Sequence, residues 1–295
     1  MTETISNPSF TGIYNFRDVG RVVNSLGAQT RLREKTFYRS GRLDDATRAD
    51  RERLVSEYGL STVIDLRTKS EHIRQAQARQ GKNRYKATVD ENLDIDTVKH
   101  QETWDTVYIS FVGRSFELNM LKQLRWWQII WFLTLMLLQF RMAAIRILGR
   151  NVLGPKGLVG LSKDSLRFCQ AEILQTLEVM TDFKAYPILV HCTQGKDRSG
   201  LILMLILFVL GVPLDIVRAE YALSDTQLEL TRASMIKEVE EVGMDAEYTR
   251  APGIVVDTVW DFLQEEYGGV DGYLDMIGFG EQKRQTLRKL LLMQS

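Results

Sequence analysis

The residues best able to do chemistry in this chain lie together in one short stretch. Residues 187–200 read Pro-Ile-Leu-Val-His-Cys-Thr-Gln-Gly-Lys-Asp-Arg-Ser-Gly, with five residues between Cys192 and Arg198. An apolar, strand-like run precedes the cysteine, and a long apolar run, residues 201–210, follows the arginine. The pattern predicts a strand, a tight turn and a helix.

This turn has the properties of an anion-binding loop. A cysteine is nucleophilic only as its thiolate, and a helix N-terminus flanked by cations stabilises that charge. We expect the backbone N–H groups from Thr193 to Arg198 to point inward, with Gly195 letting the backbone bend close to a ligand. The Arg198 guanidinium can hold two phosphate oxygens at once. The loop is therefore predicted to supply a nucleophile, Cys192, and an oxyanion cradle.

The loop resembles the signature of the cysteine-dependent protein tyrosine phosphatases, which is His-Cys, five residues, Arg, then Ser or Thr. With Gly-Lys-Asp before the arginine, it is most similar to the bacterial and fungal tyrosine/serine phosphatase group related to secreted bacterial lipid and protein phosphatases. Other stretches resemble this group in content and order: 15–20, 38–43, 63–67 with Glu71, 211–213, 220–224 and 266–274. Only residues 85–160 lack a counterpart. The resemblance implies an α/β fold with a central, mainly parallel sheet wrapped by helices and with a helical insertion.

Reaction chemistry and the resemblance assign roles within the loop. Cys192 is expected to form a cysteinyl-phosphate that water hydrolyses, while Arg198 and the loop amides hold the oxygens of the transferring group. Ser199 is expected to donate to the sulfur in the second step, although an ordinary helix N-cap serine also occupies such a position. His191 is either an orienting residue bonded to the loop backbone or a merely structural histidine. The expected substrate-binding residues are Thr193, Gln194, Gly195, Lys196 and Ser199. No metal or cofactor is needed.

A leaving alkoxide or phenolate needs a proton, so a carboxylic acid is expected near the scissile oxygen. The candidates are Asp197 in the loop and Asp65 at the end of a predicted neighbouring strand. The resemblance favours Asp197, because this phosphatase group lacks the usual mobile acid loop and has an aspartate at the matching place. Asp65 has an alternative role as an ion-pair partner of Arg67 or Arg39, and acids within residues 90–96 stay open.

Lys196 bears on the substrate. One phosphate monoester does not require a second cation in the cradle, and lipid phosphatases with Gly-Lys at this place act on multiply phosphorylated inositol rings. The resemblance thus implies a phosphatase whose partner is a phosphorylated protein (phosphotyrosine, with phosphoserine and phosphothreonine also open) or a phosphoinositide. The alternative for Lys196 is a solvated, outward-facing lysine. Two other function classes stay open: a catalytically weak adaptor that binds phospho-ligands or membranes with the same loop, and a redox protein that uses Cys192 with Cys169.

Composition limits the remaining function classes. The chain has 295 residues, with 38 basic against 38 acidic residues, which argues against bulk nucleic-acid binding. No repeat, low-complexity tract or linker divides it, so residues 1–295 are expected to form a single phosphatase domain. Both cysteines are expected to be free thiols, since a thiolate nucleophile needs a reducing compartment. The first ten residues lack the pattern of a secretory signal, which favours the cytoplasm.

The elements that must position the loop follow from short apolar runs. Val63-Ile64 and residues 188–190 end at polar residues, as expected of buried parallel strands whose C-terminal ends form a site, and Phe37-Tyr38 suits a further strand. Helices are expected at 45–58, 163–181, 200–210, 213–224, 225–242, 253–267 and 280–293. Few strands and many helices indicate an α/β core wrapped by helices.

An unusually apolar stretch, residues 126–140, lies within the unmatched segment, with cations at Lys122, Arg125, Arg141 and Arg146 on its flanks. As a helix it would be about 22 Å long, short of the roughly 30 Å hydrocarbon core of a bilayer, so we do not expect it to span. It is either a core or lid helix, as the helical insertion of related phosphatases favours, or a membrane-interface helix, which its three tryptophans suit. In the second case residues 122–146 make peripheral membrane contact. Residues 85–160 are accordingly expected to be a helical insertion or lid.

Overall fold

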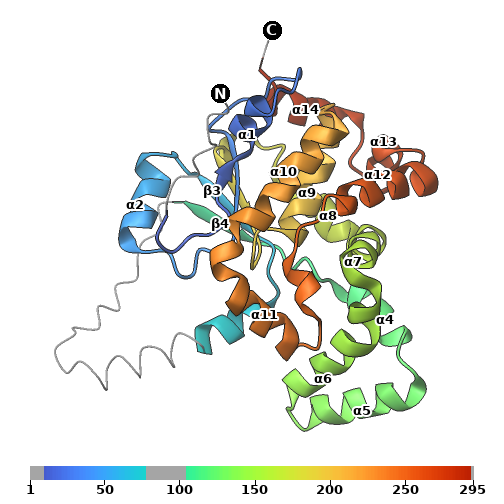
Figure 1. Cartoon of the computed structure of the whole chain (residues 1–295). Coiled ribbons are helices and arrows are strands. Elements are labelled where there is room, and N and C mark those ends of the chain that lie inside the picture. The colour runs from blue at the N-terminus through green and yellow to red at the C-terminus, as the bar shows by residue number, and fades with distance from the viewer. Residues whose placement is uncertain (1–9, 78–103, 294–295) are drawn as a thin grey trace, which may run out of the picture.

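The computed structural model describes residues 10–77 and 104–293, which are built around a sheet with the strand order β1-β2-β5-β3-β4 (Figure 1). β1 pairs antiparallel with β2, and the other neighbours pair in parallel. The predicted mainly parallel sheet is therefore confirmed. The strands are β1 (Arg17–Asp18), β2 (Phe37–Ser40), β3 (Thr62–Asp65), β4 (Asp105–Tyr108) and β5 (Ile188–His191).

The three central strands, β2, β5 and β3, are buried along their whole length, as expected of parallel strands covered by helices on both faces. Side chains alternate between two hydrophobic clusters: Leu189 packs with α2 on one face, and Ile188 and Val190 pack with α9 on the other. Figure 1 shows α2 on one side of the sheet and most other helices on the opposite side.

The helices account for most of the described chain. They are α1 (Val19–Ser25), α2 (Arg48–Ser56), α4 (Arg114–Lys122), α5 (Trp126–Leu137), α6 (Arg141–Leu148), α7 (Gly154–Phe168), α8 (Gln170–Val179), α9 (Asp197–Val209), α10 (Leu214–Gln227), α11 (Arg232–Glu241), α12 (Ile254–Tyr267), α13 (Val270–Met276) and α14 (Glu281–Leu291). Residues 69–77 are helical as well. The expected helices are present with two differences. The one at 163–181 is divided at Cys169, where α7 ends and α8 begins, and the one at 225–242 begins only at Arg232, after α10 has continued to Gln227.

Helix α9 follows the cysteine loop and passes through the centre of the larger cluster. Every residue from Ser199 to Val209 is buried, which explains why its sequence is apolar on all sides rather than on one stripe. A helix held on every side fixes the direction of its first turn. The loop before it therefore rests on the most buried part of the molecule.

The unmatched segment contributes both to the sheet and to a group of helices. Residues 85–103 of it lie outside the described residues. Its first described element is the edge strand β4, in which the two end residues are exposed and the two middle residues are partly buried. The helices α4, α5, α6 and most of α7 follow.

The apolar stretch at 126–140 does not form one helix. Helix α5 ends at Leu137, the chain turns at Gln139 with φ 64°, and α6 begins at Arg141. In Figure 1 these two helices project at the end of the molecule opposite α14. No helix among the described residues is both long and apolar enough to cross a bilayer.

Candidate active site

Three parallel strands end at the same level and bring their following loops together. Ser40 at the end of β2 pairs in register with His191 at the end of β5, which pairs with Asp65 at the end of β3. Cys192 follows directly, and α9 begins at Asp197. The structure thus has the predicted strand, turn and helix around the cysteine.

The carbonyl groups of the loop are held from behind. The Asn15 side chain donates from Nδ2 to the carbonyls of Gln194 and Gly195, both at 3.0 Å. The Arg39 guanidinium donates to the Gly195 carbonyl at 2.6 Å and to the Lys196 carbonyl at 3.3 Å. Because consecutive carbonyls face outward, the amides between them face the concave side. Within 10–77 and 104–293, the N–H groups of 193–196 have no backbone or side-chain acceptor, as the cradle hypothesis requires.

A buried ion-pair network fixes the two side chains that hold the loop. Glu220 lies between Arg17 Nε at 2.6 Å and Arg39 Nη1 at 2.7 Å, and all three side chains are buried. Burial alone would raise the pKa of Glu220, but the charges of Arg17 and Arg39 outweigh it and hold the pKa below its ordinary value. A fully ionised network of this kind resists rearrangement, since removing one partner leaves a buried charge.

Sequence reasoning missed the role of this network. Its members come from stretches 15–20, 38–43 and 220–224, which resemble the phosphatase group in sequence, but nothing in the sequence alone links them to the loop. Their signal was polar residues such as Asn15, Arg39 and Glu220 beside apolar runs. The structure shows that these distant segments converge behind residues 194–196.

Gly195 bends the backbone as expected, and its close neighbour in the structure is the end of β2. Its φ is 67°, and a Cβ built on it would stand 2.0 Å from the Ser40 carbonyl oxygen. Only a residue without a side chain fits between the loop and the end of β2.

Cys192 is buried, with 2% of its surface exposed. Burial alone would raise the pKa of its thiol, but the charge of Arg198 and hydrogen bonds from Ser199 outweigh it, so the pKa is lowered. The Ser199 hydroxyl itself has no partner of good hydrogen-bond geometry among the described residues, and its proton is thus free to turn toward the sulfur. Cys169 differs: it is a buried free thiol, and burial raises its pKa to about 12.

Arg198 is held by a residue to which the sequence analysis gave no role. Glu71 accepts from Nη1 at 2.7 Å and from Nη2 at 2.6 Å, and the Leu66 carbonyl accepts from Nη1 at 3.1 Å. Although burial opposes it, the charge of Arg198 holds the pKa of Glu71 well below its ordinary value. The Nη2 bond to Thr193 Oγ1 is long, at 3.3 Å, and Nε has no acceptor in the part of the chain that the structure describes. The Nε and Nη2 edge is therefore the one that can meet an anion.

The two candidate acids occupy different surroundings. Asp197 begins α9 and has 34% of its side chain exposed. Asp65 is buried and accepts from Arg67 Nε at 3.0 Å and from Nη2 at 2.7 Å. Although burial opposes it, the hydrogen bonds from Arg67 lower the pKa of Asp65, so this carboxylate stays ionised. The geometry matches its ion-pair alternative, with Arg67 rather than Arg39 as the partner. The acids within 90–96 lie outside the described residues.

His191 and Lys196 are both buried next to the loop. His191 Nδ1 lies 3.1 Å from the Cys192 carbonyl, and since a carbonyl only accepts, Nδ1 carries the proton. Burial lowers the pKa of His191 and favours the neutral ring. Lys196 does not face solvent: its ammonium donates to Asp197 Oδ1 at 2.6 Å and to the Tyr248 carbonyl at 3.1 Å. Neither side chain is therefore exposed to solvent.

Comparison with known proteins gives consistent matches. The sequence model of a family described as "Tyrosine phosphatase family" matches residues 8–293. A tyrosine-protein phosphatase of Nostoc commune is 34% identical over 110 residues, which cover 34% of this chain and 37% of that protein. A triple specificity protein phosphatase, PtpB, of Mycobacterium tuberculosis is 27% identical over 128 residues, covering 36% of this chain and 44% of that protein. The chain thus matches less than half the length of these curated relatives.

Proposed function

Since the chain belongs to the tyrosine phosphatase family, we propose that it hydrolyses phosphate monoesters through a cysteinyl-phosphate intermediate. The observation that carries the proposal is the loop itself. Its carbonyls are bound from behind, the amides of 193–196 have no acceptor among the described residues, and its buried cysteine has a lowered pKa. A concave set of unpaired donors around a thiolate has little structural use, but it suits the charge of a transferring phosphoryl group.

In the first step, the Cys192 sulfur attacks phosphorus, the S–P bond forms and the bond to the leaving oxygen breaks. The loop amides and the free edge of Arg198 hold the three non-bridging oxygens, whose charge they complement. Asp197 gives its proton to the leaving oxygen. We assign this role to Asp197 because it lies in the loop and is partly exposed, with one carboxylate oxygen bonded to Lys196, whereas both oxygens of the buried Asp65 accept from Arg67.

In the second step, water attacks the phosphorus and the S–P bond breaks. Asp197, now a carboxylate, takes the proton of that water, and inorganic phosphate leaves. The departing sulfur is a thiolate, and the Ser199 hydroxyl next to it can donate to it. His191 holds the Cys192 carbonyl and thereby orients the start of the loop. These steps need only groups of this chain and water.

For the substrate, we propose phosphotyrosine in proteins and phosphoinositides, with phosphoserine and phosphothreonine as weaker substrates. Lys196 adds a buried positive charge below the cradle and acts through its field, since its ammonium is bonded to Asp197 and Tyr248. Peripheral membrane contact through residues 122–146 would bring the loop to phosphorylated lipids. Because the nucleophile must stay a thiolate, we propose that the enzyme works in the cytoplasm.

Phosphate release from p-nitrophenyl phosphate tests the proposed reaction. The wild-type protein is expected to turn over, and Cys192→Ser is expected to lose turnover while keeping its melting temperature. A pure phospho-ligand adaptor would release no phosphate in either form, and a redox protein would instead show thiol exchange that requires Cys169. Either result would contradict the proposal.

A substrate panel tests the finer assignment. Phosphotyrosine peptides, phosphoserine peptides and phosphoinositides are compared with wild-type protein and with Lys196→Met, which keeps the apolar stem of the buried side chain. We expect the variant to lose more kcat/KM on phosphoinositides than on phosphotyrosine, because the more highly charged ligand gains more from a positive field. Equal losses on both would remove the substrate role of Lys196.

A further inference from the structure

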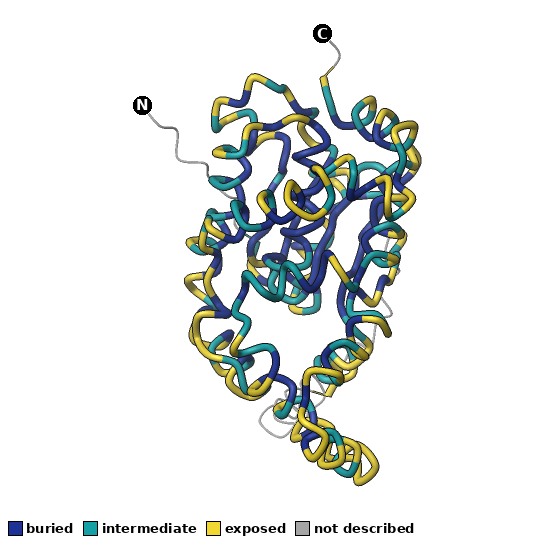
Figure 2. Tube along the Cα trace, turned by 90° about the vertical axis from the view of Figure 1, so that its right-hand side faces the viewer, coloured by how far each residue is buried: buried dark blue, intermediate teal, exposed yellow. Residues whose placement is uncertain are grey.

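Helices α5 and α6 together, residues 126–148, form a hairpin whose apolar side faces outward. In α5 the single buried residue is Gln128, while Trp126 is 74% exposed and Leu137 is 81% exposed. Figure 2 shows this end of the molecule, at the bottom of the picture, as largely exposed. Ile129 and Phe132 pack on the core, but the outward side of α5 is apolar too, unlike the polar outward side of a usual amphipathic helix on a water-soluble protein. We call this outward side the hairpin face; it includes Trp126, Trp127, Trp131, Leu133, Leu137 and Phe140.

The polar contacts of the hairpin explain why its apolar side is turned outward. Gln128 Nε2 donates to Asn151 Oδ1 at 2.9 Å, and Arg146 Nε donates to the Glu241 carbonyl at 3.0 Å. Both bonds tie the hairpin to the body of the protein through its polar groups. The hairpin face is left without a covering element among the described residues. An exposed apolar surface of this extent marks an interaction site.

The charges around the hairpin face indicate what covers it. From residue 118 to residue 163 the chain has no Asp or Glu, although it has seven Lys or Arg, while the whole chain is neutral. Three exposed cations flank these helices: Lys122 at the end of α4, Arg125 before the start of α5 and Arg141 at the start of α6. Tryptophans beside cations, with no acid between them, complement an anionic bilayer surface. A second copy fits worse, because a twofold contact through this face would bring cations against cations without acids to pair with them.

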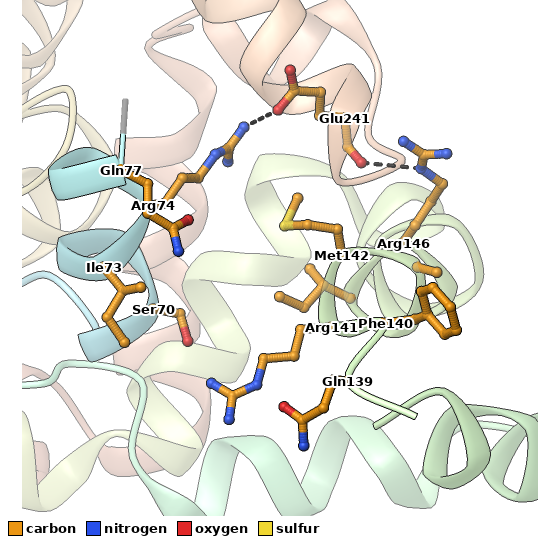
Figure 3. A pocket seen from close by; sticks show the side chains of 12 residues that line it. Ser70, Ile73, Arg74, Gln77, Gln139, Phe140, Arg141, Met142, Arg146 and Glu241 are labelled. Atoms are coloured by element: carbon orange, nitrogen blue, oxygen red, sulfur yellow. Dashed lines mark hydrogen bonds and ion pairs between the residues drawn. The ribbon is translucent and has the colours of Figure 1, made fainter. Parts of the chain in front are cut away.

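The base of the hairpin is linked to the proposed catalytic loop through the helical residues 69–77. A cavity of about 780 Å³ separates the base of the hairpin from the helical residues 69–77 (Figure 3). Arg141 and Arg146 line it on one side and Arg74, paired with Glu241, on the other. Glu71, on the same short helix as Arg74, holds Arg198. Residues 69–77 therefore lie between the base of the hairpin and the loop.

We propose that the hairpin face docks into the interface of an anionic bilayer, with α5 lying in the plane of the membrane. Helix α5 is about 18 Å long, which suits an interfacial and not a spanning helix. Docking presents the loop to phosphate groups carried by the membrane. That consequence rests on the proposed phosphatase function, whereas the docking itself does not.

Vesicle binding by the Cys192→Ser protein tests the docking without interference from turnover. Vesicles of phosphatidylcholine alone are compared with vesicles that also contain phosphatidylserine, by co-sedimentation and by the blue shift of tryptophan fluorescence. We expect at least about tenfold tighter binding to the anionic vesicles, and weaker binding at high salt. Equal binding to both vesicle types, or no binding to either, would overturn the proposal.

Two pairs of surface variants identify the surface. Trp126→Ser with Leu137→Ser is expected to weaken vesicle binding at least tenfold, whereas the matched control Phe183→Ser with Leu230→Ser, at exposed apolar positions elsewhere, leaves it unchanged. Because all four side chains are exposed, their loss is not expected to unfold the protein.

A pair of charge reversals tests the cations of the hairpin in the same way. Lys122→Glu with Arg141→Glu is expected to lower binding to anionic vesicles at least tenfold, while Lys35→Glu with Lys289→Glu, exposed positions outside the hairpin, has little effect. Failure of the hairpin pairs to differ from their controls would overturn the proposal. The proposal would also be overturned if the apolar pair of substitutions converted a dimer into a monomer. It would be overturned as well if that pair changed the turnover of a soluble aryl phosphate without changing vesicle binding, because the hairpin would then act as a lid. If the wild-type protein binds vesicles but releases no phosphate from its substrates, the phosphatase function is contradicted and the docking is not.

Discussion

Replacing Gly195 by alanine tests whether the shape of the loop supports the reaction. Two costs follow from the structure. An alanine at φ 67° is in the left-handed region, which costs about 1–2 kcal/mol. In addition, its Cβ would stand 2.0 Å from the Ser40 carbonyl oxygen. Because such contacts are ordinarily no shorter than about 3 Å, the loop or the end of β2 must move by roughly 1 Å. A displacement of this size in a catalytic group costs about a hundredfold in rate.

Gly211→Ala is the matched control for backbone strain. Gly211 has a similar φ, 71°, but a Cβ built there meets nothing within 4 Å. In this control we expect the free energy of unfolding to fall by about 1–2 kcal/mol, the cost of the left-handed backbone alone, and kcat/KM to stay unchanged. Gly195→Ala is expected to lose more stability and about a hundredfold or more in kcat/KM on p-nitrophenyl phosphate.

The assay combines urea unfolding, steady-state kinetics and vanadate inhibition for both variants. Vanadate affinity should fall in Gly195→Ala and not in Gly211→Ala, because the anion reports the loop amides directly. The reasoning is refuted if Gly195→Ala stays folded, binds vanadate like the wild type and keeps kcat/KM within about threefold. It is equally refuted if Gly211→Ala loses as much activity as Gly195→Ala, because backbone strain would then explain the loss.

Three further predictions concern single groups. Asp197→Asn is expected to lower kcat about a hundredfold on phenyl phosphate but little on a substrate whose leaving group needs no proton. Asp65→Asn should lose stability without such a dependence on the leaving group. Equal losses for Asp197→Asn on both substrates would show that another residue is the general acid. Since the pKa of Cys192 is lowered, its thiolate persists below the ordinary value of about 8.5, and iodoacetamide should label it near pH 6. Cys169, with its pKa raised to about 12, should stay unlabelled. Mass spectrometry that shows the reverse order of labelling would contradict this. Glu71→Gln should lower kcat/KM at least about tenfold, because the Arg198 guanidinium is held less firmly. It should also lower the pKa of Cys192, measured by alkylation, because one negative charge is removed. A higher pKa in a pH series of labelling rates would contradict the geometry.

The parts of the fold that were predictable are those set by local sequence. The run 188–190, the turn at Gly195 and the apolar helix after it are contiguous, so their order alone indicates a strand, a loop and a helix. The short strands β1 and β4 were not foreseen. Strand β1 consists of two charged residues, Arg17 and Asp18, and β4 of four residues that are partly or fully exposed, so neither gives an apolar run.

The supporting residues of the candidate site depend on contacts across the chain. Asn15 and Arg39 reach loop carbonyls more than 150 positions away, and Glu71 reaches Arg198 across 127 positions. Single-sequence patterns do not report such pairs, since a buried arginine reads like an exposed one until its partner is known. The hairpin is the opposite case: its apolar run suggested burial or a membrane, and the structure shows that its polar Gln128 is the buried residue.

In the proposed reaction the Cys192 sulfur carries the phosphoryl group between the two steps. Rapid acid quench of the wild-type protein with an aryl phosphate, followed by peptide mass spectrometry, detects this intermediate. We expect one phosphoryl group on the peptide that contains Cys192. It should accumulate further in Asp197→Asn on a substrate with a good leaving group, because that variant activates water poorly. Turnover that persists in Cys192→Ser, or a phosphoryl group found on any other residue, would contradict it.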